Sequence, residues 1–415
     1  MPCPWRACAP LLFGLVAAST PAPTSAAPLT YAAALDLAER SAPRLQASAL
    51  KVDAVRAASR AAGRLPDPKL SVGIQDYPVS GPNAGSFTRD DFTMVKLGVM
   101  QEVPNAARRR AELAGATAEI GVAEAMTAEE RRVVRVATAM AWIDLAYAER
   151  RLATLDQLVA GLKDLWSAQP AAVAAGSARP ATGLEPARLK AVFEDRRSEL
   201  VAAAARARAE LTRWTNEAAP TAAGNPPPFE VDPAALRVAL DRHPALLAAE
   251  AGQRKAETEV SAARAATRPD WAFEVAYGRR DPRFGDLLSA GVTVSLPLFQ
   301  GTRQEPMIAA RLADRNRAQA EREDRRRALV AALETDLADH VMHHDQWRRA
   351  VAVLVPTAEQ RAHLEVSSYG AGRASFDDVR LALTDLADAR LEALEREALT
   401  ARDGARILLT YGADQ

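Results

Sequence analysis

The chain has 415 residues, and its 53 Lys and Arg balance 53 Asp and Glu, so its formal net charge is zero. This balance gives no support to a nucleic-acid-binding surface, and a composition of 48% hydrophobic and 26% charged residues excludes a largely disordered chain. Aromatic residues make up only 5%. The apolar content comes instead from Ala, Leu and Val, and because Ala and Leu are strong helix formers we expect a mainly α fold with a small β part.

Residues 1–26 read as a secretory signal peptide. A start that carries Arg6 precedes an apolar run from about Cys8 to Ser19, and small residues follow up to Ala26. The alternative is a buried N-terminal helix, which the short run and its flanks favour less. Both cysteines fall within this segment, so the mature chain is expected to lack disulfides, and no later segment approaches the 18 apolar residues of a spanning helix.

The rest of the chain reads as a duplication. The spacing from Pro43 to Pro68 equals that from Pro244 to Pro269, and LGVMQEVP, which ends at Pro104, has a counterpart in AGVTVSLP. A sequence repeat of this length indicates a duplicated domain rather than a solenoid. We therefore expect a helix–strand–strand–helix unit at 27–222, a Pro-rich linker at 223–230 and a second unit at 231–415.

Two strand-like segments are expected in each unit, at about 69–76 and 92–100 and at about 271–278 and 288–296. Apolar and polar residues alternate along them, so each strand has one apolar and one polar face. Their lengths are close to those of tilted strands that cross a bilayer. In that reading the apolar face meets lipid, and the pore-facing residues are the following: Gln75, Lys96, Glu274 and Thr293.

The alternative is a soluble sheet whose apolar face covers a core. Four strands cannot close a bilayer barrel, which needs at least about eight, and an open sheet would leave unpaired edges in hydrocarbon. The barrel reading therefore requires several chains. Three copies would give twelve strands.

A long helix follows each strand pair, at about 105–168 and about 303–355, and each is bounded by prolines. Two seams of apolar residues run along the first one, on different faces. One seam suits a two-stranded coiled coil, whereas two seams mean a neighbour on each side. This pattern favours a closed ring of helices.

Several segments resemble the TolC family of trimeric outer-membrane efflux ducts. They are LPDPKLSVGI, DDFTMVKLGVMQEVP, AGVTVSLPLFQGTR and the run YGAGRASFDDVRLALTDLADARLEA from Tyr369 to Ala393. The resemblance implies a homotrimer with a periplasmic α-helical tunnel and a shared 12-stranded barrel in outer-membrane lipid. It also implies a passive duct without a cofactor, served by a periplasmic adaptor and an inner-membrane pump of the resistance-nodulation-division type. The first two segments are similar to the heavy-metal (CzcC/CusC-like) subgroup, which implies metal cations as cargo.

The same resemblance places Tyr369, Gly372 and Asp378 at the periplasmic tip of the tunnel. Arg373 follows the glycine directly, whereas family members often have an Arg two residues after it. A second tip aspartate falls on Leu381, and Asp377 is the candidate to replace it in a cation-attracting ring. The alternative for both aspartates is ordinary capping of a helix N-terminus.

A histidine cluster offers a candidate metal site. His340 and His344 lie four residues apart, with Asp336 one turn before them, and this spacing suits Cu or Zn. The favoured alternative is packing or tunnel lining, because these histidines belong to an apolar seam. The members of that seam are Val330, Leu333, Leu337, His340, His344, Trp347, Val351 and Leu354.

Three functional classes remain at this point. The efflux duct leads, with metal cations or, alternatively, drugs and other organic compounds as cargo. A periplasmic coiled-coil adaptor without a barrel is the second, but it leaves the two alternating hairpins unexplained. An exported helical enzyme is the third, and the sequence contains no GxxxxGK[ST], GxSxG or HExxH motif to support it.

Overall fold

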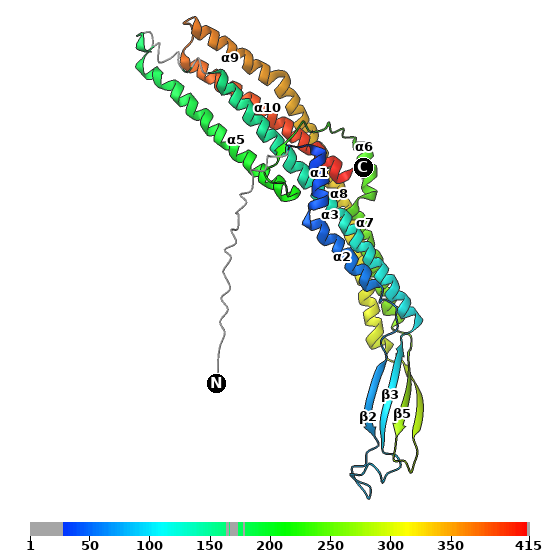
Figure 1. The fold of residues 1–415 in the computed structure, drawn as a ribbon. Coiled ribbons are helices and arrows are strands. Elements are labelled where there is room, and N and C mark those ends of the chain that lie inside the picture. The colour runs from blue at the N-terminus through cyan, green and yellow to red at the C-terminus, as the bar shows by residue number, and fades with distance from the viewer. Residues whose placement is uncertain (1–27, 163–165, 167–172, 177–178, 413–415) are drawn as a thin grey trace, which may run out of the picture.

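The computed structural model describes residues 28–162, 166, 173–176 and 179–412. The molecule is elongated, with a small sheet at one end and helix turns at the other (Figure 1). The expected mainly α fold with a small β part is confirmed. The expected signal peptide, residues 1–26, lies outside the described residues.

The first half of the chain places its elements in this order: β1 (Pro28–Leu29), α1 (Tyr31–Ser41), α2 (Pro43–Ser59), β2 (Lys69–Gln75), β3 (Met94–Val103), α3 (Ala106–Gly161), the 3-10 turn Pro180–Leu184, α5 (Glu185–Thr215) and β4 (Thr221–Ala222). Local chemistry sets the helix starts: the Thr30 hydroxyl accepts from the amide of Ala33, and the Asn105 side chain accepts from that of Arg108. Part of the expected end of the helix at 105–168 lies outside the described residues.

The second half has a similar order of helices, two strands and long helices, without short strands like β1 and β4 among its described residues: α6 (Pro233–Ala239), the 3-10 turn Leu240–Arg242, α7 (Pro244–Ala265), β5 (Asp270–Arg279), β6 (Leu287–Ser295), α8 (Gln300–Arg349), the π turn Ala350–Leu354, α9 (Val355–Gly370) and α10 (Phe376–Tyr411). Pro43 and Pro244 each occupy the first position of a helix, α2 and α7, where the missing amide hydrogen costs nothing. The β2–β3 and β5–β6 hairpins thus follow α2 and α7, two helices that begin in the same way.

The second long helix differs from the expectation that it stops near residue 355. Helical structure continues from α8 through the π turn into α9, as far as Gly370. Pro356 is the second residue of α9, just beyond this wider turn, where backbone carbonyls lack an i+4 donor and a residue without an N–H is tolerated. Of the predicted apolar seam, Leu333 and Leu337 are buried, whereas Val330, Val351 and Leu354 are exposed.

All four long strands form one antiparallel sheet in the order β2-β3-β5-β6, so β3 and β5 join the two halves of the chain at its centre. The register pairs Val72 with Leu97, Leu97 with Tyr277, and Tyr277 with Leu288. Opposed residues of an antiparallel sheet share a face. The apolar positions of the four strands therefore lie on the same side.

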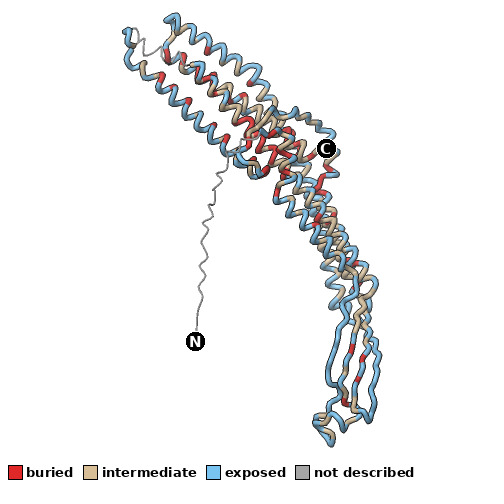
Figure 2. Tube along the Cα trace, in the orientation of Figure 1, coloured by how far each residue is buried: buried red, intermediate tan, exposed pale blue. Residues whose placement is uncertain are grey.

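Next to the sheet, the helices form a layer in which α2 packs on α3, α3 on α7, and α7 on α8. At the other end α5 and α10 pack on α3, and α9 packs on α10 (Figure 1). Buried residues concentrate between these regions, where α1, α3, α5 and α10 meet (Figure 2). None of the described helices is both long and apolar enough to cross a membrane.

Candidate functional site

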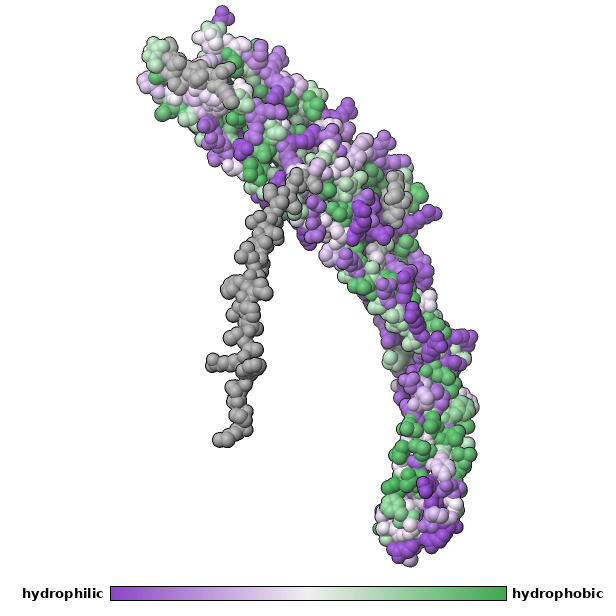
Figure 3. Space-filling view, in the orientation of Figure 1, coloured by the Kyte–Doolittle hydropathy of each residue, from purple (hydrophilic) through white to green (hydrophobic). Residues whose placement is uncertain are grey.

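One face of the sheet is a continuous apolar surface. Its large side chains are each at least 44% exposed, and they are Leu70, Val72, Ile74, Val95, Leu97, Val99, Trp271, Phe273, Val275, Tyr277, Leu288 and Val292. The space-filling view shows hydrophobic residues gathered over this end of the molecule (Figure 3). An exposed apolar patch of this extent marks a surface that meets lipid or another protein.

The opposite face of the sheet is polar and built from small residues. The strand register places Gln75, Lys96, Glu274 and Thr293 together on this face. Paired residues of neighbouring strands share a face, and all four residues lie at the positions that alternate with the apolar ones. The Nζ atom of Lys96 lies 3.0 Å from Oε1 of Glu274. The structure thus brings the four candidate pore residues to one face and joins two of them in an ion pair, which sequence reasoning had not paired.

At the far end of the molecule, the turn between α9 and α10 contains the candidate tip residues. Gly372 has φ of +71°, a left-handed conformation that favours glycine. The rings of Tyr369 and Phe376 meet edge to face, with centroids 5.9 Å apart. The amide of Arg373 donates to the carbonyl of Ser368 at 2.8 Å, while its side chain stays exposed. The ring contact and the backbone hydrogen bond thus fix the conformation of the turn.

The two tip aspartates have different local roles. Asp378 forms a capping box with Ser375: its carboxylate accepts from the Ser375 hydroxyl at 2.7 Å, and its amide donates to the Ser375 hydroxyl. The hydrogen bond from the Ser375 hydroxyl, and a second one from the Ser375 amide at 2.9 Å, hold the pKa of the Asp378 carboxyl below its usual range. The capping alternative therefore holds for Asp378. The role of Asp378 in a cation-attracting ring stays a prediction.

Asp377 instead pairs with a neighbouring arginine. The Arg380 guanidinium lies 2.6 Å from the Asp377 carboxylate, and it also lies 3.4 Å from Glu185 at the start of α5. Arg380 thereby links the two helix turns at this end of the molecule. Sequence reasoning missed this link, because nothing local to residue 380 indicates a partner at residue 185.

The histidine cluster lies where α8 crosses α10. The rings of His340 and His344 have centroids 6.4 Å apart. The carboxylate of Asp336 has other partners: it accepts a hydrogen bond from the Tyr411 hydroxyl at 2.9 Å and forms an ion pair with Arg406 at 3.1 Å. Within the described ranges, no group of three or more His, Cys, Asp and Glu side chains is arranged to hold a metal ion. The metal role of His340, His344 and Asp336 stays a prediction.

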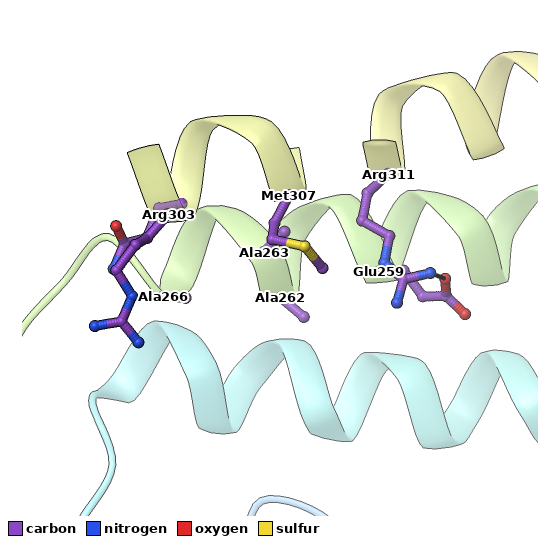
Figure 4. A pocket seen from close by; sticks show the side chains of 8 residues that line it. Glu259, Ala262, Ala263, Ala266, Arg303, Met307 and Arg311 are labelled. Carbon is purple, nitrogen blue, oxygen red and sulfur yellow. Dashed lines mark hydrogen bonds and ion pairs between the residues drawn. The ribbon is translucent and has the colours of Figure 1, made fainter. Parts of the chain in front are cut away.

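A shallow groove of about 370 Å³ lies between α7 and α8, close to the sheet. Figure 4 shows Met307 and Arg303 of α8 above a row of alanines on α7, with Arg311 beside Glu259. The guanidinium of Arg311 lies 3.0 Å from the Glu259 carboxylate and 3.3 Å from that of Asp314. Because Arg311 is paired in this way, we interpret the groove as part of the packing interface between α7 and α8.

Comparison with known proteins adds to this geometry. Residues 235–412 match the family model of outer membrane efflux proteins. That range contains β5, β6 and the turn with Gly372, so Glu274, Thr293 and the tip residues all lie in the part that resembles these efflux proteins. No curated protein matches the chain in sequence.

The likeness in fold extends over nearly the whole chain. A membrane protein from Pseudomonas aeruginosa superposes with a TM-score of 0.81 at 18% identity, over 92% of this chain and 90% of that one. For the outer membrane protein VceC of Vibrio cholerae the TM-score is 0.76 at 17% identity, over 92% and 96%. For the open state of the outer membrane channel MtrE of Neisseria gonorrhoeae it is 0.74 at 16% identity, over 92% and 89%. This chain therefore shares the fold of these three proteins.

Proposed function

We propose that this protein is the outer-membrane exit duct of a tripartite efflux system, passively conducting substrate from an inner-membrane pump and a periplasmic adaptor to the exterior. The observation that carries the proposal is the sheet: it has one apolar face, which is exposed, and one polar face. A bilayer strand needs this division, with apolar side chains toward lipid and polar ones toward water. A soluble adaptor would instead have to cover the apolar face.

The edges of the fold support assembly with further copies. β2 and β6 form the two edges of the sheet, and α2 and α8 are the outer helices of the layer beside it. An open sheet leaves unpaired backbone groups that hydrocarbon does not tolerate, so β6 of one copy must pair with β2 of the next. Three copies would close a barrel of about twelve strands, within the range of bilayer barrels. The homotrimer is therefore part of the proposal.

For the cargo we favour heavy-metal cations, on the resemblance of LPDPKL and DDFTMVKLGVMQEVP to the metal subgroup. Drugs and other organic compounds are the competing class. Deleting the gene and measuring the strain's tolerance to copper, silver, zinc, cobalt and cadmium, and to a panel of drugs, separates the two. A loss of tolerance confined to drugs would overturn the metal assignment and leave the duct intact.

The duct itself is tested by placing an arginine on each face of the sheet. Leu97→Arg introduces a charge on the apolar face, where a lipid-facing cation costs about 2–4 kcal/mol at the midplane. Thr293→Arg introduces the same side chain on the polar face and is the matched control. We expect unboiled gels of the membrane fraction to show an outer-membrane trimer for wild type and Thr293→Arg, and little trimer for Leu97→Arg. A soluble periplasmic monomer in wild type would contradict the proposal.

A further inference from the structure

Charged side chains on the polar face of the sheet occur as pairs. Lys96 of β3 and Glu274 of β5 lie 3.0 Å apart between Nζ and Oε1, with side chains 32% and 29% exposed. Lys69 of β2 contacts Glu102 of β3 in the same way. Both pairs run diagonally across neighbouring strands.

The backbone beneath the Lys96–Glu274 pair is shaped to hold it. Lys96 stands opposite Gly278 and Glu274 opposite Met100, so the pair spans the position between them, where Gly98 faces Ala276. A methyl group on Gly98 would lie 3.2 Å from Oε1 of Glu274 and 2.7 Å from Oγ of Ser71. Glycine weakens a strand interior unless something needs the room. Here the Ser71 hydroxyl and the carboxylate of Glu274 occupy that room.

On the polar face Lys69 and Lys96 are balanced by Glu102 and Glu274. The remaining ionisable side chain on this face of the four strands is Asp270, and it is engaged by the amide of Asn105 and by Arg108 at the start of α3. Each lysine thus has a glutamate beside it. A pore lined by this face would present neither a cationic nor an anionic wall.

We propose that Glu274 sets the ion selectivity of the strand-lined part of the duct by neutralising Lys96, so that cations pass a wall that contains lysines. The inference rests on the proposed duct function, because it requires the polar face to line a water-filled pore. Removing either partner exposes one unpaired charge per copy, and symmetry multiplies it. Rings of charged side chains are known determinants of pore selectivity.

The test uses the full-length protein in planar lipid bilayers under a KCl gradient, from which the cation-to-anion permeability ratio is obtained. Glu274→Gln leaves Lys96 unpaired, and we expect the ratio to fall roughly two- to fourfold, since a ring of unit charges acts through screened water. Lys96→Gln should raise the ratio by a similar factor. The double variant Lys96→Gln/Glu274→Gln removes both charges, and the swapped pair Lys96→Glu/Glu274→Lys exchanges them. Both should return the permeability ratio to that of wild type.

The outcomes separate the two proposals. If wild type conducts and neither single variant changes the permeability ratio, the selectivity role of the pair is overturned while the duct stands. If purified wild-type trimers do not conduct, the duct proposal falls, and this inference with it. A shift of the same sign in both single variants would also overturn the pair, because removal of opposite charges must act in opposite directions.

Discussion

The Nδ1 atom of His343 lies 2.6 Å from Oδ2 of Asp403, and this contact joins the last part of α8 to the last part of α10. Asp403 is only 6% exposed. Its other oxygen lies 3.2 Å from Arg406, whose guanidinium also reaches Asp336. A buried carboxylate is costly unless it is paired, so this small network holds the two helices at the crossing.

The first prediction concerns this contact. His343→Ala removes one donor from a buried carboxylate, and we expect the free energy of unfolding to fall by about 1–3 kcal/mol. Thermal denaturation of the purified protein in detergent measures it. His344→Ala is the matched control, because that neighbouring imidazole is 42% exposed and its contact with Asp345 is a loose 3.9 Å. Equal losses in both variants would show that the His343–Asp403 contact has no special part.

The second prediction concerns pH. Burial lowers the pKa of His340, the positive charges of His343 and His344 add to this, and Asp403 opposes it. Its Nδ1 atom has no hydrogen-bond partner among the described residues. Because the unfolded chain takes up the proton at a higher pH than the folded one, stability should decline as the pH falls below about 6.5, the ordinary value for histidine.

Thermal midpoints measured at a series of pH values between about 8 and 5 test this expectation, since that range brackets histidine titration. In His340→Gln the decline at acid pH should be smaller than in wild type. The same decline in both proteins would mean that His340 is not responsible, and that other ionisable groups dominate.

The third prediction concerns the turn between α9 and α10. Gly372→Ala forces a side chain into a left-handed conformation and should cost about 1–2 kcal/mol. Gly370→Ala is the control: neither position has an atom within 4 Å of an added Cβ, but Gly370 ends a helix without a positive φ. We expect faster amide exchange in the turn only for Gly372→Ala. Faster exchange in both variants would point to a cause other than backbone strain.

The fourth prediction concerns the core at α3. Trp142 is fully buried, its indole Nε1 donates to the carbonyl of Leu29 at 2.7 Å, and its ring meets that of Tyr31 edge to face. Trp142→Ala should lower the free energy of unfolding by about 3–5 kcal/mol. Trp142→Phe keeps an aromatic ring in place and removes one of two donors to the Leu29 carbonyl, which keeps the amide of Ala223 at 2.9 Å, so it should cost about 0.5–1.5 kcal/mol. Chemical denaturation distinguishes them, and equal losses would assign no part to ring volume.

Local patterns predicted much of the fold. Alternation at Leu70, Val72 and Ile74 is a property of neighbouring residues, so the strands could be located from the sequence and lie within three residues of the expected positions. The same alternation placed Lys96 and Glu274 on a common face. Their pairing could not be predicted, because the register between β3 and β5 depends on how the two halves meet.

Long-range contacts account for what was missed. The partner of His343 is 60 residues away in sequence, on a helix whose pattern gives no sign that Asp403 is buried. The helix end predicted near Pro356 is wrong, because the π turn before this proline lets the helix continue. Both features depend on three-dimensional packing.

The central pairing of β3 with β5 has a consequence for how the chain folds. The amide of Asn105, just after β3, donates to Asp270 at the start of β5, across 165 residues of sequence. An isolated two-stranded hairpin is marginally stable, so the β2–β3 hairpin has to wait until the second half of the chain has been made. Contacts between such distant residues form slowly, and in the interval each hairpin exposes its apolar face. This protein should therefore depend on protection from aggregation between its synthesis and its assembly.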